Sequence, residues 1–231
     1  MHSAMKRIMG TKQDYSKRSF SQCGEDLIMD HIFQALRIER PSYLDIGAHH
    51  PQHFSNTSFF YSKGSRGINI EPDPALFEAF LVDRREDINL NIGVAAVPGE
   101  ADLYIMNQPA LNTFIKEEAN RVHHEHPPYI VKEVRRIPMK PVSEIIQQYW
   151  NGSFPDFLTI DVEGMDEEII RSINYDACAP KIICAETLRF SPQRRWEKKT
   201  ELIDFLKQKG YFTYADTYIN TIFMRKEIWF E

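Results

Sequence analysis

The chain has 231 residues, of which 42% are hydrophobic and 26% are charged, and these proportions suit one globular α/β domain with a full core. Its formal net charge of -5 gives no basic field for binding a phosphate backbone, which disfavours nucleic acid as a main partner. Three cysteines without CxxC spacing predict a reduced, cytoplasmic protein, and no run approaches the roughly 18 apolar residues of a membrane span.

The first part of the chain alternates between predicted helix and strand. Residues 1–19 are polar and basic and are expected to form a tail, so a single domain is expected over 20–231. The apolar periodicity predicts a helix over 25–38, strands over 43–46, 67–70 and 88–92, and a helix over 74–85. This βαβ order is typical of an open α/β sheet, whose ligands bind at the carboxyl ends of its strands.

A longer segment interrupts this rhythm, because about 65 residues separate the third strand from the next apolar run. The segment is expected to hold an insertion at about 96–141, in which 102–106 and 133–139 could pair as strands. Insertions at the carboxyl edge of such a sheet commonly cover the active site. Substrate recognition is therefore expected here, around Asn112, Thr113 and Arg121.

The remaining elements complete the sheet. Apolar runs predict strands over 157–160, 181–185, 211–215 and 221–225, and helices are expected over 165–173 and from a Thr200 cap to Gly210. Seven strands with a closing pair predict a mostly parallel, doubly wound sheet with helices on both faces and an antiparallel terminal hairpin. An aromatic set is expected in the core: Phe54, Phe59, Phe60 and Tyr61.

Two of the predicted strands end in a carboxylate, Asp45 in YLDIGAHHP and Glu71 in GINIEPDP. A dinucleotide fold uses GxGxxG so that backbone amides hold a pyrophosphate, but the loop DIGAHHPQ has only one glycine of the three. S-adenosylmethionine has no phosphate, its sulfonium charge is favourable beside carboxylates, and Glu71 is placed to accept hydrogen bonds from both ribose hydroxyls. The alternative is that Asp45 and Glu71 are helix caps or solvating groups at strand ends.

Several segments follow one another in a specific order: SQCGED, YLDIGAHHP, FSNTSFFY, GINIEPDP, INLNIGVA, ALNTF, FLTIDVEGMDEEII and APKIICAE. The coupled set DIGA, INIEP and IDVEG is their most specific part. This order resembles the FkbM family of S-adenosylmethionine-dependent methyltransferases over roughly residues 20–225. The resemblance implies a Rossmann-like, class I methyltransferase sheet and O-methylation of a hydroxyl, often on a sugar.

The resemblance also implies which residues contact S-adenosylmethionine. They are Asp45, Gly47 and Ala48 along the methionine end, Glu71 and Pro72 at the ribose, Asn91 and the loop after it near the adenine, and Gln22 and Glu25, which help to close the site. Asp161 is also expected to contact the cofactor.

One departure concerns the loop after DIGA, where most members of the family have an asparagine and a second glycine. This chain has His49, His50 and Pro51 instead, and the backbone there is expected not to bend as a glycine would. HHP followed by FSNT and FY resembles a subgroup often found beside surface-polysaccharide genes.

Candidate catalytic groups follow the apolar run FLTI. Asp161 and Glu163 stand at the end of this strand, where alternation would point both to the same side. A sugar hydroxyl must lose its proton as it attacks the methyl group, and Asp161 or one of His49, His50 and His53 could accept that proton. The alternative for Asp161 is a cap on the following helix.

Further polar residues are candidates for the substrate or for a metal. Asn56, Glu186 and Arg189 are expected to contact the substrate, Arg189 because its loop could pair with the diphosphate of a nucleotide sugar. Asp161, Glu163 and Glu186 could instead hold Mg²⁺, which prefers oxygen ligands.

The sequence therefore predicts an S-adenosylmethionine-dependent O-methyltransferase that acts on a sugar hydroxyl, of a nucleotide-activated or a polysaccharide-linked sugar. One alternative is a nicotinamide-dependent sugar-nucleotide oxidoreductase, which the missing glycines and the lack of a Tyr-x-x-x-Lys pair disfavour. Another is a non-catalytic domain that binds a partner enzyme of a polysaccharide pathway.

Overall fold

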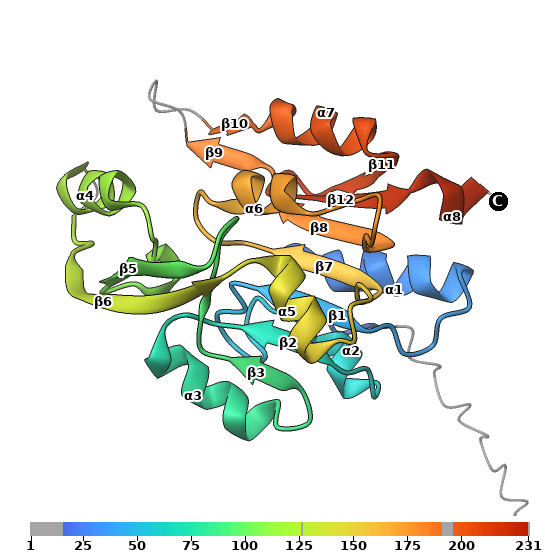
Figure 1. Cartoon of the computed structure of the whole chain (residues 1–231), viewed down its shortest axis with the longest axis horizontal. Helices are drawn as coiled ribbons and strands as arrows, with labels where there is room; N and C mark the ends of the chain where they lie inside the picture. The colour runs from blue at the N-terminus through green and yellow to red at the C-terminus, as the bar shows by residue number, and fades with distance from the viewer. Residues whose placement is uncertain (1–15, 126, 191–195, 231) are drawn as a thin grey trace, which may run out of the picture.

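A seven-stranded sheet with the order β11-β12-β8-β7-β1-β2-β3 forms the centre of the computed structural model (Figure 1). The structure describes residues 16–125, 127–190 and 196–230, so most of the expected tail lies outside the described residues. The strands of this sheet are β1 (Tyr43–Ile46), β2 (Gly67–Ile70), β3 (Ile88–Leu90), β7 (Phe157–Ile160), β8 (Ile182–Glu186), β11 (Tyr211–Asp216) and β12 (Asn220–Arg225).

The direction of the strands confirms the predicted fold. β1 pairs in parallel with β2 and β7, and the parallel arrangement continues to β3 and β8. β12 pairs antiparallel with both β8 and β11, so the end of the chain forms an antiparallel hairpin within the sheet. Because the five parallel strands all end at one edge, the residues that follow them meet there.

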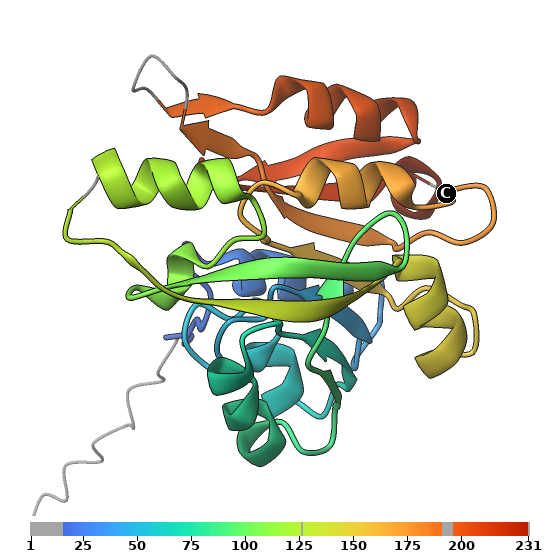
Figure 2. The ribbon, with the colours of Figure 1, turned by 60° about the vertical axis from the view of Figure 1, so that its left-hand side comes forward.

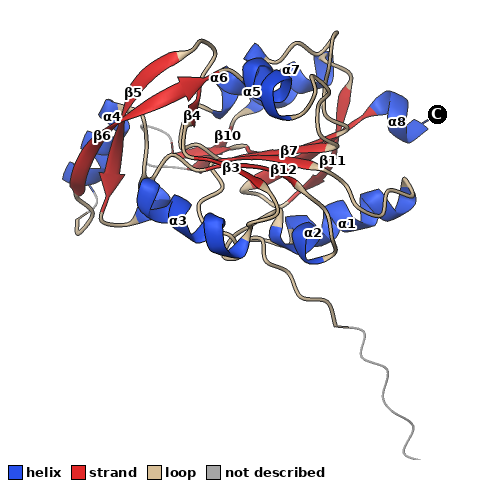
Figure 3. Cartoon of the chain, turned by 60° about the horizontal axis from the view of Figure 1, so that its bottom comes forward, coloured by secondary structure: helices blue, strands red, loops and turns tan. Residues whose placement is uncertain are grey.

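Helices cover both faces of the sheet, as predicted (Figure 3). α1 (Glu25–Ala35), α2 (Ser58–Ser62) and α3 (Pro74–Asp83) lie on one face, and α5 (Val142–Tyr149), α6 (Asp166–Ser172) and α7 (Thr200–Gln208) lie on the other. Side-chain alternation explains the two cores, since Tyr43 and Phe157 pack with the first group of helices while Leu44 and Leu158 pack with the second. A short helix, α8 (Lys226–Phe230), follows the last strand.

The segment between β3 and α5 forms a second sheet. β5 (Gly99–Met106) pairs antiparallel with β6 (Val131–Lys140), as the sequence predicts, and β6 also pairs with β4 (Gly93–Val94). η1 (Pro109–Leu111) and α4 (Lys116–Glu125) lie between β5 and β6. Figures 1 and 2 show this sheet and α4 at one end of the central sheet.

Three smaller features complete the description. β9 (Leu188–Phe190) and β10 (Trp196–Lys198) form an antiparallel ribbon beside the hairpin. The predicted Thr200 cap is wrong, because Thr200 is the first residue of α7 and Lys199 takes the cap position without a side-chain cap bond. No helix in the described ranges has both the length and the apolarity needed to span a membrane.

Candidate functional site

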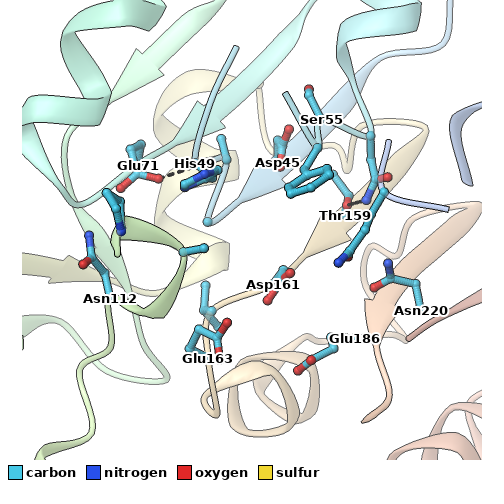
Figure 4. A pocket seen from close by; sticks show the side chains of 18 of the residues that line it. Asp45, His49, Ser55, Glu71, Asn112, Thr159, Asp161, Glu163, Glu186 and Asn220 are labelled. Carbon is cyan, nitrogen blue, oxygen red and sulfur yellow. Dashed lines mark hydrogen bonds between the residues drawn. The ribbon is translucent and has the colours of Figure 1, made fainter. Parts of the chain in front are cut away.

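A cavity of about 560 Å³ opens at the carboxyl edge of the parallel strands. This volume lies within the range of about 300–1,000 Å³ that is usual for small-molecule sites. Figure 4 shows Glu71, His49 and Asn112 on one side of the cavity, Glu186 and Asn220 on the other, and Asp161 between them. The cavity therefore joins the ends of β1, β2, β7 and β8 to the second sheet, which contributes Leu103 and the residues around η1.

Glu71 is fixed at the end of β2 by two backbone amides. His49 N donates to Glu71 Oε2 and Asp73 N donates to Glu71 Oε1, each at 2.8 Å. A carboxylate oxygen accepts more than one hydrogen bond, so both oxygens keep capacity for a ligand in the cavity. Burial raises the pKa of Glu71 to about 8, although both amide bonds act to lower it. Glu71 is not a helix cap, because Asp73 caps α3 by accepting from Ala75 N at 2.9 Å.

Asp45 on β1 is held by a buried chain of polar side chains. Thr57 Oγ1 donates to Asp45 Oδ2 at 2.7 Å, and Arg84 Nη2 donates to Thr57 Oγ1 at 3.0 Å. Arg84 is only 1% exposed and also donates to Tyr43 Oη at 2.8 Å and to the Pro51 carbonyl at 3.1 Å. Burial raises the pKa of Asp45 to about 6, and the bond from Thr57 acts to lower it. Sequence reasoning missed both Thr57 and Arg84.

Gly47 brings the loop after β1 against the end of β7. Its φ is +77°, and a Cβ built on it would lie 1.9 Å from the Asp161 carbonyl oxygen, so a side chain does not fit here. The adjacent Ala48 and Gly47 amides both donate to the Ile70 carbonyl at 3.0 Å, which ties this loop to β2. Gly47 and Ala48 both line the cavity.

Three further carboxylates line the cavity, on Asp161, Glu163 and Glu186. Although Asp161 is exposed to the open cavity, desolvation by the cavity walls raises its pKa to about 8, helped by the nearby charges of Glu186 and Asp166, while Lys199 acts to lower it. Burial and the charge of Asp161 also raise the pKa of Glu163 well above its ordinary value. In the absence of a ligand, these groups therefore hold protons more tightly than free carboxylates do.

Lys199 is the cation that faces this acidic group. Its Nζ lies 3.0 Å from Glu186 Oε2 and 3.3 Å from Asp166 Oδ2, and the side chain is only 11% exposed. Burial raises the pKa of Glu186, and Lys199 counteracts this. In the part of the chain that the structure describes, no group of three His, Cys, Asp or Glu side chains is arranged to hold a metal ion.

The alternation expected between Asp161 and Glu163 is wrong, because β7 already ends at Ile160. The two side chains reach the same cavity through a turn in which Glu163 has a left-handed φ of 48°. Asp161 is not the cap of α6, since Met165 takes the cap position, without a side-chain cap bond.

Of the three candidate histidines, His49 lines the cavity. His50 Nδ1 accepts from the backbone amides of Gln52 and His53 at 3.0 Å, and the His53 ring stacks on Phe54 at 3.9 Å. The expectation that this loop does not bend like glycine is wrong, because His49 itself adopts a φ of 54°. Burial lowers the pKa of His49, as do the charges of His50 and His53, so its neutral form is favoured.

The structure brings most of the other expected residues to the cavity. Gln22, Asn56, Pro72 and Asn112 all line it. Asn56 Nδ2 donates to Thr159 Oγ1 at 2.9 Å, which fixes its amide at the end of β7.

Three expected residues support the cavity wall from behind. Asn91 Nδ2 donates to the carbonyl oxygens of Glu71 and Pro72, at 2.8 and 3.0 Å. Glu25 Oε1 accepts from Asn220 Nδ2 at 3.0 Å, and Asn220 lines the cavity. Thr113 Oγ1 donates to the Glu163 carbonyl at 3.1 Å and thereby joins the second sheet to the turn after β7.

Two arginines lie away from the cavity. Arg121 pairs with Glu118 and Glu125 along its own helix, α4. Arg189 has a side chain that is 51% exposed and lies 3.9 Å from Glu201. Neither residue lines the cavity, because the local helix and the ribbon direct them toward acidic neighbours.

The aromatic rim of the cavity was also missed. We use this name for Phe54, Trp196 and Tyr218, which line the cavity and are 51%, 58% and 60% exposed. The expectation that Phe54 lies in the core is wrong, whereas Phe60 is buried as expected, at 2% exposure. No common sequence signal marks this rim, because Phe54 and Trp196 lie within four residues of a proline whereas Tyr218 has no glycine or proline nearby.

Comparison with known proteins identifies the family of the chain. Residues 45–213 match the model of the methyltransferase FkbM domain, while a search of curated proteins finds no match.

Solved structures with a similar chain course include a methyltransferase FkbM from Methylobacillus flagellatus KT, at 14% identity and a TM-score of 0.45, over 80% of this chain and 44% of that one. The chain thus spans less than half the length of that relative. A TehB-like SAM-dependent methyltransferase from Corynebacterium glutamicum is 13% identical over 88% of both chains, with a TM-score of 0.45. A 1,6-didemethyltoxoflavin-N1-methyltransferase from Burkholderia thailandensis is 11% identical over 87% of this chain and 77% of that one, with a TM-score of 0.41.

The family match extends over well more than half of the chain, and it contains Asp45, Glu71 and Asp161 together with the loops that join them into one cavity. The chain belongs to the FkbM methyltransferase domain family.

Proposed function

We propose that this chain transfers a methyl group from S-adenosylmethionine to a hydroxyl group of a sugar. The observation that carries the proposal is the placement of Glu71, a buried carboxylate whose oxygens are each fixed by one amide and face a cavity. One carboxylate held in this way suits the paired hydroxyls of a ribose. Family membership favours this activity over an oxidoreductase or a non-catalytic domain.

The rest of the cavity suits a cationic cofactor better than a pyrophosphate. No lysine or arginine occurs among the described residues that line it, whereas five carboxylates do: Asp45, Glu71, Asp161, Glu163 and Glu186. In this proposal Gln22, Asp45 and the Gly47–Ala48 loop contact the methionine end of the cofactor. Glu71 and Pro72 contact the ribose, and Asn91 supports both through their carbonyl groups.

Methyl transfer needs the hydroxyl oxygen directly opposite the sulfur. An electron pair on oxygen forms the new bond to the methyl carbon while the carbon–sulfur bond breaks, and S-adenosylhomocysteine leaves. Correct orientation of the two reactants contributes about 7–11 kcal/mol to such reactions. The cavity can orient the two reactants because the strand ends line one part of it, and Leu103 of the second sheet and Asn112 beside η1 line another. We assign to residues 96–141 the role of covering the cavity.

The hydroxyl proton passes to Asp161 or to His49. Asp161 holds a proton in the free site because desolvation by the cavity walls and the charges of Glu186 and Asp166 raise its pKa to about 8, and a bound sulfonium favours its ionised form. His49 is favoured in its neutral form, which can accept a proton. A general base of this kind contributes about 10²- to 10⁴-fold to the rate.

Calorimetric titration with S-adenosylmethionine tests the cofactor, and absence of binding at millimolar concentration would overturn the proposal. Labelled cofactor with a panel of sugars, glycosides and nucleotide sugars tests the acceptor by the mass gain of one methylene. Asp161→Asn is expected to keep binding and lose at least about 100-fold in kcat. Asp204→Asn, at an exposed position on α7, is the matched control. Unchanged turnover in Asp161→Asn would remove Asp161 as the base.

A further inference from the structure

The aromatic rim has no role in the mechanism above. Its members come from three separate places, the loop after β1, strand β10 and the turn between β11 and β12, and more than half of each side chain is exposed. All three nevertheless line the same cavity. Large apolar side chains that gather at the mouth of a cavity mark a surface that is covered when a ligand binds.

The backbone holds two of these side chains in uncommon conformations. Phe54 has a φ of 56° and Tyr218 has a φ of 75°, a left-handed region that bulky residues rarely adopt. The described residues include six non-glycine positions with positive φ, and four of them line the cavity: His49, Phe54, Glu163 and Tyr218. Strained positions of this kind persist where the surrounding structure fixes them, and they cluster at functional sites.

Polar contacts keep the Tyr218 ring in place. Tyr218 N donates to Asp216 Oδ1 at 2.7 Å, and Lys198 Nζ binds the same oxygen at 2.8 Å while lying 5.9 Å from the ring centre. In the loop after β1, the His53 ring stacks on Phe54. Phe54 and Tyr218 are therefore held in place before a ligand arrives, which lowers the entropic cost of binding.

The charge of the cavity limits what the rim can hold. Behind it stand Asp161, Glu163 and Glu186, and the cationic Lys199 is already engaged by Glu186. A diphosphate would find no lysine or arginine among the described residues that line the cavity, so its charge would be left unpaired, which costs free energy. Sugar hydroxyls, in contrast, donate hydrogen bonds to carboxylates and to the amide oxygens of residues such as Asn220, and the apolar face of a sugar ring packs on an aromatic ring.

We propose that Phe54, Trp196 and Tyr218 form a subsite that stacks a sugar ring next to the methylated one, so that the acceptor is an uncharged oligosaccharide or glycoside and not a nucleotide sugar. This inference rests on the proposed function and narrows its substrate class. In this proposal the aromatic rim packs against a sugar ring of the acceptor, and the carboxylates accept hydrogen bonds from the hydroxyls of the acceptor.

The test compares neutral oligosaccharides of several configurations with nucleotide sugars, using labelled S-adenosylmethionine. Trp196→Ala and Tyr218→Ala are expected to raise the KM for the neutral acceptor about five- to tenfold each, with kcat and the Kd for the cofactor unchanged. Phe230→Ala is the matched control, because Phe230 is 72% exposed on α8 and does not line the cavity.

The outcomes separate the two proposals. If the protein does not bind S-adenosylmethionine, the proposed function fails. If the cofactor binds but only nucleotide sugars are methylated, or if no neutral acceptor in the panel is bound or methylated, the subsite is wrong while the cofactor assignment stands. An unchanged KM in both rim variants would also overturn the subsite.

Discussion

Replacing Thr57 by valine removes the hydrogen bond that stabilises the charged form of Asp45, together with the oxygen that accepts from Arg84 Nη2. Valine has nearly the same shape as threonine but lacks the hydroxyl that donates to Asp45 Oδ2 at 2.7 Å. A hydrogen bond to a charged group contributes about 1.5–3 kcal/mol, and one pKa unit corresponds to about 1.4 kcal/mol. Loss of the bond therefore raises the pKa of Asp45 from about 6 to between about 7 and 8.

This change has a characteristic pH dependence if the ionised Asp45 contacts the cationic cofactor. At pH 7 about nine-tenths of the wild-type Asp45 is ionised, against about one-half to one-tenth in Thr57→Val, which weakens cofactor binding about two- to tenfold. At pH 9 both proteins are almost fully ionised, so their affinities converge.

Calorimetric titration from pH 6 to pH 9 measures this difference directly. Thr57→Ser keeps the hydroxyl and serves as the control, with an affinity near that of the wild type at every pH. A loss of affinity in Thr57→Val that is the same at pH 6 and pH 9 would refute the reasoning, because it would indicate a change of shape and not of ionisation.

Three further predictions concern the same cavity. S-adenosylmethionine should bind more tightly as the pH rises toward 8, because its positive charge favours the ionised form of carboxylates whose pKa values are raised. The affinity for S-adenosylhomocysteine, which lacks the sulfonium charge, should depend less on pH. Parallel calorimetric titrations of the two compounds measure this difference. Gly47→Ala should lower the Tm or abolish folding because its Cβ meets the Asp161 carbonyl, while Gly99→Ala, with open space around it, should leave the Tm nearly unchanged. Lys199→Met should lower the free energy of unfolding in denaturant by about 3–5 kcal/mol, because it leaves buried carboxylates unpaired. Lys207→Met, at an exposed pair, should lower it by about 1 kcal/mol or less. Equal losses in the two variants would contradict this reasoning.

The central sheet could be predicted from sequence because its strands are short apolar runs bounded by polar residues. FLTI and GINI are buried at all four positions, and each is followed directly by the acid that lines the cavity. Parallel strands bring such acids together regardless of the details of the loops. Asp45, Glu71 and Asp161 were therefore accessible to sequence reasoning.

Residues whose position depends on loops were not accessible in the same way. The sequence predicts no helix at the position of α4, because only Ala119 and Val122 on it are buried, too few to give a helical pattern. Arg84 and Arg85 are adjacent and chemically identical, yet the first is buried and the second is exposed. Tertiary contacts distinguish them, because Arg84 pairs with the buried Asp87 and donates to Tyr43 on β1 and to the Pro51 carbonyl of the HHP loop.

The hydrogen bond between Glu25 and Asn220 joins positions 195 residues apart. Closing a loop of this length costs conformational entropy. A chain still emerging from the ribosome lacks this wall of the cavity until the strand that carries Asn220 has been synthesised. The cavity is therefore complete only when these two distant parts of the chain have met.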